Sequence, residues 1–289
     1  MKSSHKVICS VIASLIAFGA FFAYMSTVDI PVLFPSGWVA AEQKHLIVVA
    51  TILMMIIVLP VFGMMVFFAW KYREGNHQSD YQPEFHHSYL AEFFWWGFPF
   101  VIVSILGTMA WTSSHRLNPY RPLEIATDKK PIQIQVVALD WKWLFIYPEY
   151  KIATINLMAF PEKTPIQLFI TSDAPMNSFW IPDLAGQIYG MSGMETQLHL
   201  IADKKGSYRG CSAQINGIGF AGMVFEAKAT SDEEFDTWVE TAQQSSNILN
   251  HKSYQQLLQK SQYDPVKYFS LEDPGLFKQI IMKYTNPKV

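Results

Sequence analysis

The run 208–223, YRGCSAQINGIGFAGM, holds the residues of this chain with the clearest potential for chemistry. It is a Gly-rich turn between two β-like runs, with Cys211 near its start and Met223 at its end. Thiolate and thioether sulfur are soft ligands that suit copper, so the run has the form of a copper-binding loop. Its middle departs from that form, because it carries polar and aromatic residues where copper would need Cys and His: Ser212, Asn216 and Phe220.

Sulfur and imidazole groups elsewhere do not make a clearer metal site. The two cysteines, Cys9 and Cys211, are far apart in the sequence and form neither a disulfide framework nor a CxxC motif. Met191, Met194 and His199 follow one another closely, but a Met near a β core usually packs, and His199 has no Cys or His beside it. We therefore expect no new copper site there, and we expect Cys211 to be a small buried hydrophobe.

Two long apolar stretches must place this loop relative to a membrane. The chain has 289 residues, half of them apolar, and a net charge of -2 without a basic patch, which argues against nucleic-acid binding. Stretch 46–69 contains no charge, and membrane helices tolerate its Pro60; stretch 93–111 has Trp at both ends, where aromatic belts lie. About 20 apolar residues cross the hydrocarbon core, so we predict a transmembrane helix hairpin over 45–115.

A further apolar stretch, 7–25, follows Lys2 and Lys6. Segment 1–26 is therefore either a signal peptide or a retained membrane anchor. The apolar run is long for a signal peptide, but small residues that would permit cleavage are present at Ala17 and Gly19. Both alternatives place the following segment, 26–44, outside the cell membrane.

Basic residues between the two predicted spans set the orientation of the hairpin. Lys71 and Arg73 directly follow the first span, so the positive-inside rule makes the loop up to residue 92 cytoplasmic. His86 and His87 lie in this loop, where we expect solvated polar groups. The chain after Ser113 is then external.

From about residue 125 the pattern changes to short β-rich runs separated by Pro, Gly and Asp: PIQIQVVALDWKWLFIYP, TPIQLFITS, TQLHLIAD and GMVFEAKAT. Such runs predict an all-β sandwich or barrel over 124–230. Residues 231–289 are predicted to form a helical, aromatic-rich tail. Its first helix begins with a capping box of Ser231 and Glu234 and carries three apolar residues on one face, Phe235, Trp238 and Val239.

Three of these motifs together resemble a known family. The loop at 208–223, the run MNSFWIPDLAGQIYGMSGMETQLHLIA before it and LDWKWLFIYPE earlier look like subunit II of the haem-copper respiratory oxidases. The resemblance covers nearly the whole chain and implies a cupredoxin-like fold for 124–230. In the cytochrome c oxidase branch the loop reads Cys-x3-Cys-x3-His-x2-Met, with a Glu carbonyl and an upstream His, and it holds two copper ions bridged by thiolates.

Alignment on Met223 shows which ligands this chain would supply. Ser212 and Asn216 take the positions of the first and second Cys, and Gln214 takes that of the Glu. Phe220 takes the position of the His in the loop, and Asn177 that of the upstream His. Both thiolates and both imidazoles of the copper-bearing branch are replaced. Cys211 is one residue out of register, and a shift of one residue on a β-strand turns a side chain to the opposite face.

These replacements resemble the quinol oxidase branch, similar to cytochrome bo-type ubiquinol oxidase. The resemblance implies subunit II of a proton-pumping ubiquinol oxidase in a bacterial inner membrane, multi-pass, with its C-terminal domain in the periplasm. It implies no catalytic, cofactor-binding or metal-binding residue in this chain, with haems and copper in subunit I, further membrane subunits as partners and ubiquinol as the substrate of the complex. The alternative is a membrane-tethered cupredoxin-like module for copper delivery or assembly, which would be expected to carry an intact ligand cluster.

Two further motifs acquire a role from the same resemblance. EFFWWGFP matches the family pattern Glu-x-x-Trp-x-x-x-Pro, which implies that Glu92 lies near a cytoplasmic proton-uptake pathway of subunit I. The alternative is an ordinary interfacial carboxylate at a helix N-terminus, which the helix dipole favours. Trp141 and Trp143 match an aromatic stretch that serves electron transfer in the copper-bearing branch, but without the metal we expect them to pack in the core or an interface.

Overall fold

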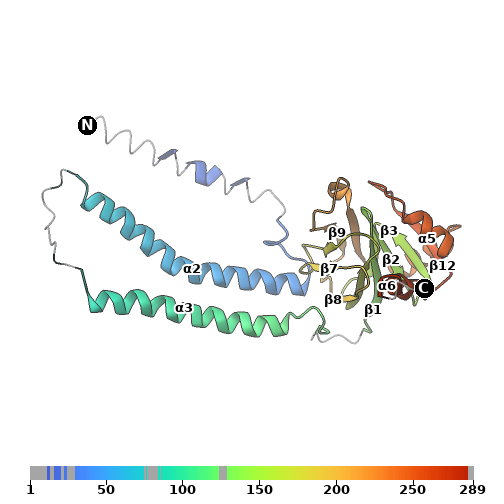
Figure 1. Cartoon of the computed structure of the whole chain (residues 1–289), viewed down its shortest axis with the longest axis horizontal. Helices are drawn as coiled ribbons and strands as arrows, with labels where there is room; N and C mark the ends of the chain where they lie inside the picture. The colour runs from blue at the N-terminus through green and yellow to red at the C-terminus, as the bar shows by residue number, and fades with distance from the viewer. Residues whose placement is uncertain are drawn as a thin grey trace.

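Two long helices project from a β domain, as the computed structural model in Figure 1 shows. The structure describes residues 12–13, 16–20, 23–24, 30–74, 76, 84, 86–123 and 129–285. Most of the predicted signal or anchor segment 1–26, including Cys9, lies outside the described residues. The choice between signal peptide and anchor therefore stays a prediction.

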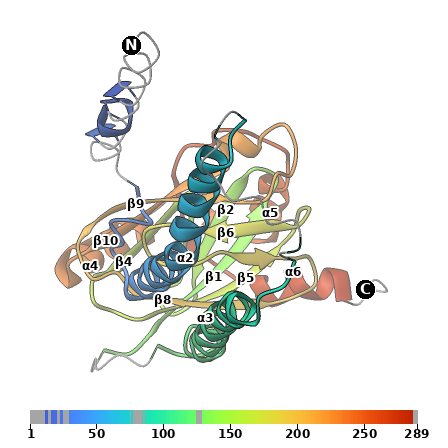
Figure 2. The same cartoon turned by 90° about the vertical axis from the view of Figure 1, so that its left-hand side faces the viewer.

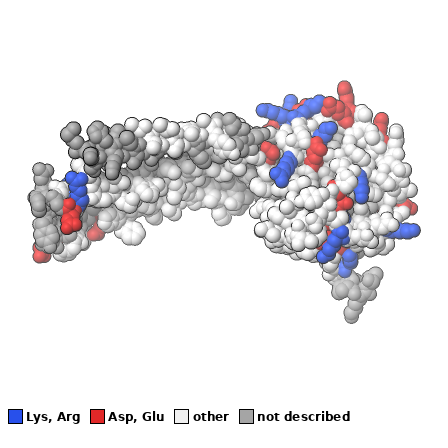
Figure 3. Space-filling view, turned by 90° about the horizontal axis from the view of Figure 1, so that it is seen from above, with Lys and Arg blue, Asp and Glu red and all other residues white. Residues whose placement is uncertain are grey.

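The helices are α2 (Trp38–Lys71) and α3 (Tyr89–Arg116), and both are long and apolar enough to cross a membrane. The 34 residues of α2 correspond to about 51 Å at 1.5 Å per residue, more than the roughly 30 Å of a hydrocarbon core. Pro60 lies inside α2 without ending it. Most side chains along both helices are exposed, and the face drawn in Figure 3 is uncharged between the far end of the helices and the domain. The predicted spans lie inside these helices, but α2 begins before the predicted start of the hairpin at residue 45.

The β domain is a sandwich of two sheets. The seven-stranded sheet has the order β11-β12-β3-β2-β1-β5-β8, with β1 (Ile132–Leu139), β2 (Lys142–Tyr147), β3 (Ile152–Ile155), β5 (Ile166–Ser172), β8 (Thr196–Leu200), β11 (Ile248–Leu249) and β12 (Lys267–Leu271). The five-stranded sheet has the order β4-β10-β9-β6-β7, with β4 (Leu157–Pro161), β6 (Asn177–Trp180), β7 (Ile188–Gly190), β9 (Gly206–Ser212) and β10 (Val224–Thr230). Most neighbouring strands are antiparallel, while three pairs are parallel: β1 with β5, β4 with β10, and β11 with β12.

The seven-stranded sheet is buried on both faces. In β2, Trp143 and Phe145 belong to the core between the sheets, whereas Leu144 and Ile146 belong to a second core. The second core is covered by the tail helices α5 (His251–Leu257) and α6 (Leu276–Thr285). Continuous apolar runs such as KWLFIY are typical of strands covered on both faces, which explains why this run does not alternate.

The tail is integrated with the sandwich. Helix α4 (Asp232–Gln243) begins with the predicted capping box of Ser231 and Glu234, and it buries Phe235 and Val239 in the main core. Figure 2 shows α4 at one side of the domain and α6 at the opposite side. The tail also contains two strands that the sequence did not predict: β12 pairs with β3, and β11 with β12. Their pairing covers the hydrogen-bonding edge that β3 would otherwise expose.

The start of α2 is fixed to the β domain through the backbone. The amides of Ser36 and Gly37 donate to the carbonyl of Asp183 at 2.9 and 3.1 Å, and the amide of Asp203 donates to the carbonyl of Ser36 at 2.9 Å. Val39, in the first turn of α2, belongs to the main core. The membrane helices and the domain are therefore joined by packing as well as by the chain.

Candidate functional site: the former copper loop

The ends of three strands position the loop. Ser212 is the last residue of β9, Asn177 is the first of β6, and Met223 stands between the short 3-10 helix η1 (Phe220–Gly222) and β10. The amide of Ser212 donates to the carbonyl of Met223 at 3.1 Å, and the amide of Ala213 donates to the carbonyl of Ser178 at 2.9 Å. These backbone bonds close the loop between β9 and β10 over the end of β6.

Four of the positions predicted from the copper motif meet in one hydrogen-bonded cluster. The Asn177 Oδ1 accepts from the Ser212 hydroxyl at 3.3 Å and from the Asn216 amide group. The same Asn216 Nδ2 lies 3.4 Å from the Met223 sulfur. Asn177, Ser212 and Met223 are buried, so neutral side chains satisfy one another in the interior. The remaining Asn216 oxygen, Oδ1, is buried without a hydrogen-bond partner in the described part of the chain.

Gln214 and Phe220 take part differently. The backbone carbonyl oxygen of Gln214 lies 3.2 Å from the Ser212 hydroxyl oxygen, so the backbone of Gln214, the position of the Glu in the copper motif, turns toward the cluster. The backbone amide nitrogen of Gln214 lies 3.4 Å from the same hydroxyl oxygen. Phe220 begins η1 with its amide bonded to the carbonyl of Gly217, and no hydrogen bond joins its side chain to the cluster.

Cys211 points away from this cluster. Along β9, Tyr208, Gly210 and Ser212 are buried on one face, while Cys211 shares the other face with the exposed Arg209. Partial burial raises the pKa of the Cys211 thiol, although the nearby charge of Arg209 lowers it. A thiol that stays protonated at neutral pH is a poor copper ligand, because the thiolate is the form that binds metal.

Trp141 and Trp143 support the loop by packing. Trp141 lies against the loop glycines: a Cβ at Gly219 would come within 2.2 Å of its ring, so only glycine allows this close approach. Trp143 contacts Phe179 and Phe225 with ring centroids 5.3 and 5.7 Å apart. The two tryptophans thus lie in the core beside and beneath the loop, in the packing arrangement that we predicted for them.

The donor set does not fit a dinuclear copper centre. Such a centre needs bridging thiolates and imidazoles, whereas this cluster offers amide and hydroxyl groups and one thioether. Among the described residues, no group of three or more His, Cys, Asp or Glu side chains could hold a metal ion. What the arrangement can do is keep the cupredoxin-like loop closed without a metal.

The other predicted sites lie apart from the loop. Glu92 is in the first turn of α3, with Oε1 3.5 Å from the His87 Nε2, at the end of the hairpin away from the domain. The Nδ1 of His199 bonds to the Pro119 carbonyl. The Thr171 hydroxyl donates to the carbonyl of Met194 at 2.7 Å, with the carbonyl of Met191 3.2 Å from the same hydroxyl, and no described hydrogen bond joins these methionines to His199.

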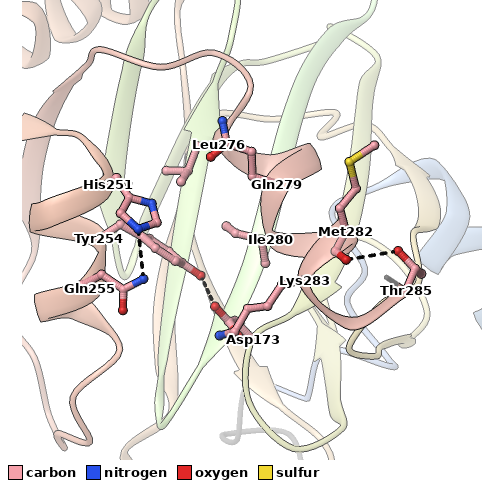
Figure 4. A pocket seen from close by; sticks show the side chains of 10 residues that line it. All are labelled: Asp173, His251, Tyr254, Gln255, Leu276, Gln279, Ile280, Met282, Lys283 and Thr285. Atoms are coloured by element: carbon pink, nitrogen blue, oxygen red, sulfur yellow. Dashed lines mark hydrogen bonds and ion pairs between the residues drawn. The ribbon is translucent and has the colours of Figure 1, made fainter. Parts of the chain in front are cut away.

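A cluster around Asp173 was not predicted. Asp173 directly follows β5 and its side chain is buried. Its carboxylate accepts from the hydroxyls of Tyr254 and Tyr284 and from the Lys283 ammonium, at 2.7 Å for Tyr254 and Lys283. Figure 4 shows it at the base of a cavity of about 630 Å³ between α5 and α6. The cluster ties α5 and α6 to the sandwich. No local sequence signal marks it, because the partners of Asp173 lie 81 to 111 positions after it in the sequence.

Comparison with known proteins first identifies the class of protein to which this chain belongs. A family model described as the periplasmic domain of cytochrome c oxidase subunit II matches residues 149–230, and the COX Aromatic Rich Motif matches residues 243–288. The β domain and the tail are therefore those of an oxidase subunit II. The two spanning-length helices and this domain make the chain an inner-membrane protein with a periplasmic domain.

Similar proteins from other bacteria show to which branch of the oxidase subunit II proteins the chain belongs. The chain is 50% identical over 250 residues to cytochrome bo(3) ubiquinol oxidase subunit 2 of Pseudomonas putida, covering 86% of this chain and 79% of that protein. The protein of the same name from Pseudomonas aeruginosa is 48% identical, with 89% and 77% covered. Ubiquinol oxidase subunit 2 of Acetobacter aceti is 45% identical, with 90% and 85% covered. The chain belongs to the ubiquinol oxidase subunit 2 family.

Proposed function

We propose that this chain is the non-catalytic subunit II of a proton-pumping ubiquinol oxidase. Subunit I would hold the haems, the oxygen-reducing copper and the quinol, and this chain would bind no redox cofactor. The two spanning helices would form a multi-pass hairpin against subunit I, with the periplasmic domain above it. Ubiquinol would reach the complex from the membrane, so no soluble electron donor would need to dock on this chain.

One observation carries this proposal, the neutral hydrogen-bonded cluster of Asn177, Ser212, Asn216 and Met223. An electron relay on the periplasmic domain requires thiolates that share charge between two copper ions. Hydroxyl and amide groups that bond to one another cannot supply this chemistry. Without the relay, an external one-electron donor would face a long gap to the haems.

The copper delivery or assembly alternative lacks a supporting site. A delivery module needs exchangeable soft ligands, and the cluster offers one thioether, Met223, beside amide and hydroxyl groups. Cys211 faces away from it. The residues therefore favour the oxidase subunit.

The test is to determine which electron donor the purified complex oxidises. Oxygen consumption is measured with a short-chain ubiquinol and with reduced cytochrome c, and copper is counted per complex. We expect rapid turnover with the ubiquinol, none with cytochrome c, and the single copper ion of subunit I. Rapid oxidation of cytochrome c, or copper beyond that single ion, would overturn the proposal.

A further inference from the structure

A segment of the tail lies against the former copper loop. Residues 259–264 fall between α5 and β12, inside the part of the chain that the COX Aromatic Rich Motif matches. We refer to residues 259–264 as the strap. Its partners lie more than 100 positions earlier in β2, and about 40 positions earlier in the loop itself.

The first contact joins the strap to Gly222, the last residue of η1. A Cβ on Gly222 would come within 2.9 Å of the Tyr263 ring, so the ring packs directly on the glycine. The φ angle of Tyr263 is 56°, a left-handed backbone that a tyrosine seldom adopts and that persists where the surrounding structure holds it. Tyr263 is nevertheless 70% exposed. Its ring therefore forms an outer cover on the loop.

The second contact covers Trp141. An added Cβ would come within 2.2 Å of its indole at Gly219 and within 3.2 Å at Gly217, so the loop glycines pack on this ring. The Lys260 Nζ lies 5.8 Å from the centroid of the same ring, where a cation is attracted to the aromatic face, and 4.0 Å from Oδ2 of Asp140. Trp141 is only 8% exposed. The loop and the strap together keep the indole away from the surface.

The strap is anchored by a buried ammonium group. Lys142, the first residue of β2, is 3% exposed. Its Nζ donates to the Gln259 carbonyl at 2.9 Å and to the Ser261 hydroxyl. It also lies 3.6 Å from Oδ2 of Asp264. An ammonium group has three donors, and these three partners all belong to the strap. Because a buried ammonium without partners is costly, the strap is what allows a lysine at this position.

A side-chain amide fixes the far end of the strap. The Asn156 Nδ2 donates to the carbonyl of Asp264 at 2.9 Å, and its Oδ1 accepts from the backbone amide of Trp143 at 2.9 Å. Asn156 is buried. It thus joins the strap to β2 beneath the loop.

From these contacts we propose that the strap holds the metal-free loop closed and keeps Trp141 off the surface. Hydrogen bonds inside the loop do not satisfy it completely, since Oδ1 of Asn216 and Nε1 of Trp141 are buried without a partner among the described residues. Packing of Tyr263 on η1 and of Lys260 on Trp141 fixes the loop from outside. When the strap is released, the loop opens and the indole becomes accessible. The inference rests on the proposed function in one respect, that the loop holds no metal.

Hydrogen exchange of the purified full chain in detergent tests this coupling. The amides of Phe220, Gly222 and Met223 make the backbone bonds that form η1 and its end, and we expect them to be protected in the wild type. Tyr263→Ala removes the covering ring and should speed their exchange about tenfold, because local opening then breaks fewer contacts. Tyr263 is exposed, so the sandwich should stay folded and the amides of β1 and β5 should stay protected. Tyr284→Ala is the matched control: it removes another tail tyrosine and should loosen α6 without affecting the loop.

Hydroxyl-radical footprinting of Trp141 tests the anchor. Lys142→Met removes the ammonium group that holds the strap, and it should increase oxidation of the Trp141 indole several-fold. Lys252→Met, at an exposed lysine on α5, is the control and should leave this oxidation unchanged.

Gly222→Ala tests the contact from the side of the loop. The added methyl group displaces the Tyr263 ring, so this variant should loosen the loop as Tyr263→Ala does. Without the ring the methyl group meets no obstacle, so the double variant should exchange no faster than Tyr263→Ala alone. Independent losses of stability would instead add.

Two results would overturn the inference. One is wild-type exchange of the η1 amides in Tyr263→Ala together with unchanged oxidation of Trp141 in Lys142→Met. The other is additive loosening by Gly222→Ala and Tyr263→Ala. Either result leaves the proposed function standing, because no turnover is measured, whereas copper bound to the wild-type chain in the same preparation would contradict the proposed function.

Discussion

Ser212 and Asn216 show how a cupredoxin-like loop can be held in place without metal ligands. A hydroxyl and an amide take the places of two thiolates and bond to Asn177, while the Met223 sulfur stays beside them. A hydrogen-bonded polar cluster can hold three strand ends together where a metal would otherwise do so. The backbone of the loop is therefore expected to remain compatible with copper.

Restoring the ligands tests this expectation. We predict that the chain with Asn177→His, Ser212→Cys, Gln214→Glu, Asn216→Cys and Phe220→His binds two copper ions and gains a purple thiolate-copper absorption. The physical reason is that the strand ends already bring Asn177, Ser212 and Asn216 together. The measurement is copper per chain with a visible spectrum. A control that keeps Ser212 and Asn216 but carries the other three changes should stay colourless. If the variant with all five substitutions folds but stays colourless in excess copper, the backbone of the loop does not have the geometry that copper binding needs.

Glu92 carries a second prediction at this scale. Glu92→Gln should slow oxygen consumption of the assembled complex without preventing assembly, because a carboxylate at the cytoplasmic end of α3 can collect protons and an amide cannot. Turnover is measured across pH with ubiquinol. Glu84→Gln, an exposed carboxylate in the preceding loop, is the control. Wild-type rates for Glu92→Gln at every pH would leave Glu92 as an ordinary N-terminal helix residue.

What could be predicted at this scale depended on local spacing. The loop positions were found because the motif is continuous in sequence, and Asn177 was found through the short MNSF run. Lys142 was not found, although it is buried and bonds to the Gln259 carbonyl at 2.9 Å. Burial lowers the pKa of Lys142, while the charge of Asp264 opposes this effect. A lysine buried by a segment more than 100 residues away has no local signal.

Among the elements, the C-terminal tail contains the strands that the periodicity of the sequence did not predict. The helix α4 was predicted from its capping box and apolar face, which are local features. Strands β11 and β12 were not, because KYFSL becomes a strand only by pairing with β3. The sandwich itself was predictable from its short β runs, but the burial of both faces of β2 depends on α5 and α6.

The Asp173 cluster gives a prediction for these elements. Asp173→Asn should lower the free energy of unfolding of the full chain by about 2 kcal/mol, the range for a hydrogen bond to a charged group. The figure is modest because the Lys283 side chain is 50% exposed while that of Asp173 is fully buried. Chemical denaturation in detergent measures the change, and protection of α6 in hydrogen exchange locates it. Glu272→Gln, which removes an exposed carboxylate near β12, should have no effect.

The same cluster predicts an alkaline transition. Burial opposes the charge of Lys283, but its hydrogen bond to Asp173 and the charge of that carboxylate more than offset burial and raise the pKa of Lys283. Burial, followed by the hydrogen bond to Asp173, also raises the pKa of Tyr254 and of Tyr284. All three groups hold their protons more strongly in the folded state. Their stabilisation is therefore complete below the unfolded pKa values of about 10 and is lost as pH rises further. Unfolding free energies should fall above pH of about 10 in the wild type, and less so in Asp173→Asn.

At the scale of the whole molecule, the contact between α2 and the domain decides whether the membrane part and the periplasmic part move as one. The apolar spans and the β domain were each predictable from composition, but their contact was not. It depends on backbone groups of residues 36–40 that meet Leu184 and Asp183, which lie about 145 positions later. Backbone contacts of this kind leave no pattern in side-chain chemistry.

Gly37 makes this contact possible and carries the last prediction. A Cβ at Gly37 would lie 2.6 Å from the carbonyl oxygen of Ile201 and 2.8 Å from that of Leu184, and these backbone atoms cannot move aside as a flexible side chain could. Gly37→Ala should therefore separate the start of α2 from the domain, at a cost of about 1–3 kcal/mol for overpacking. Hydrogen exchange should increase at the amides of residues 36–40 and Asp203, while the interior of the sandwich stays protected. Gly63→Ala, with nothing within 4 Å of the added carbon, is the matched control. Unchanged protection at residues 36–40 in Gly37→Ala would mean that the two parts are not held together by this backbone contact.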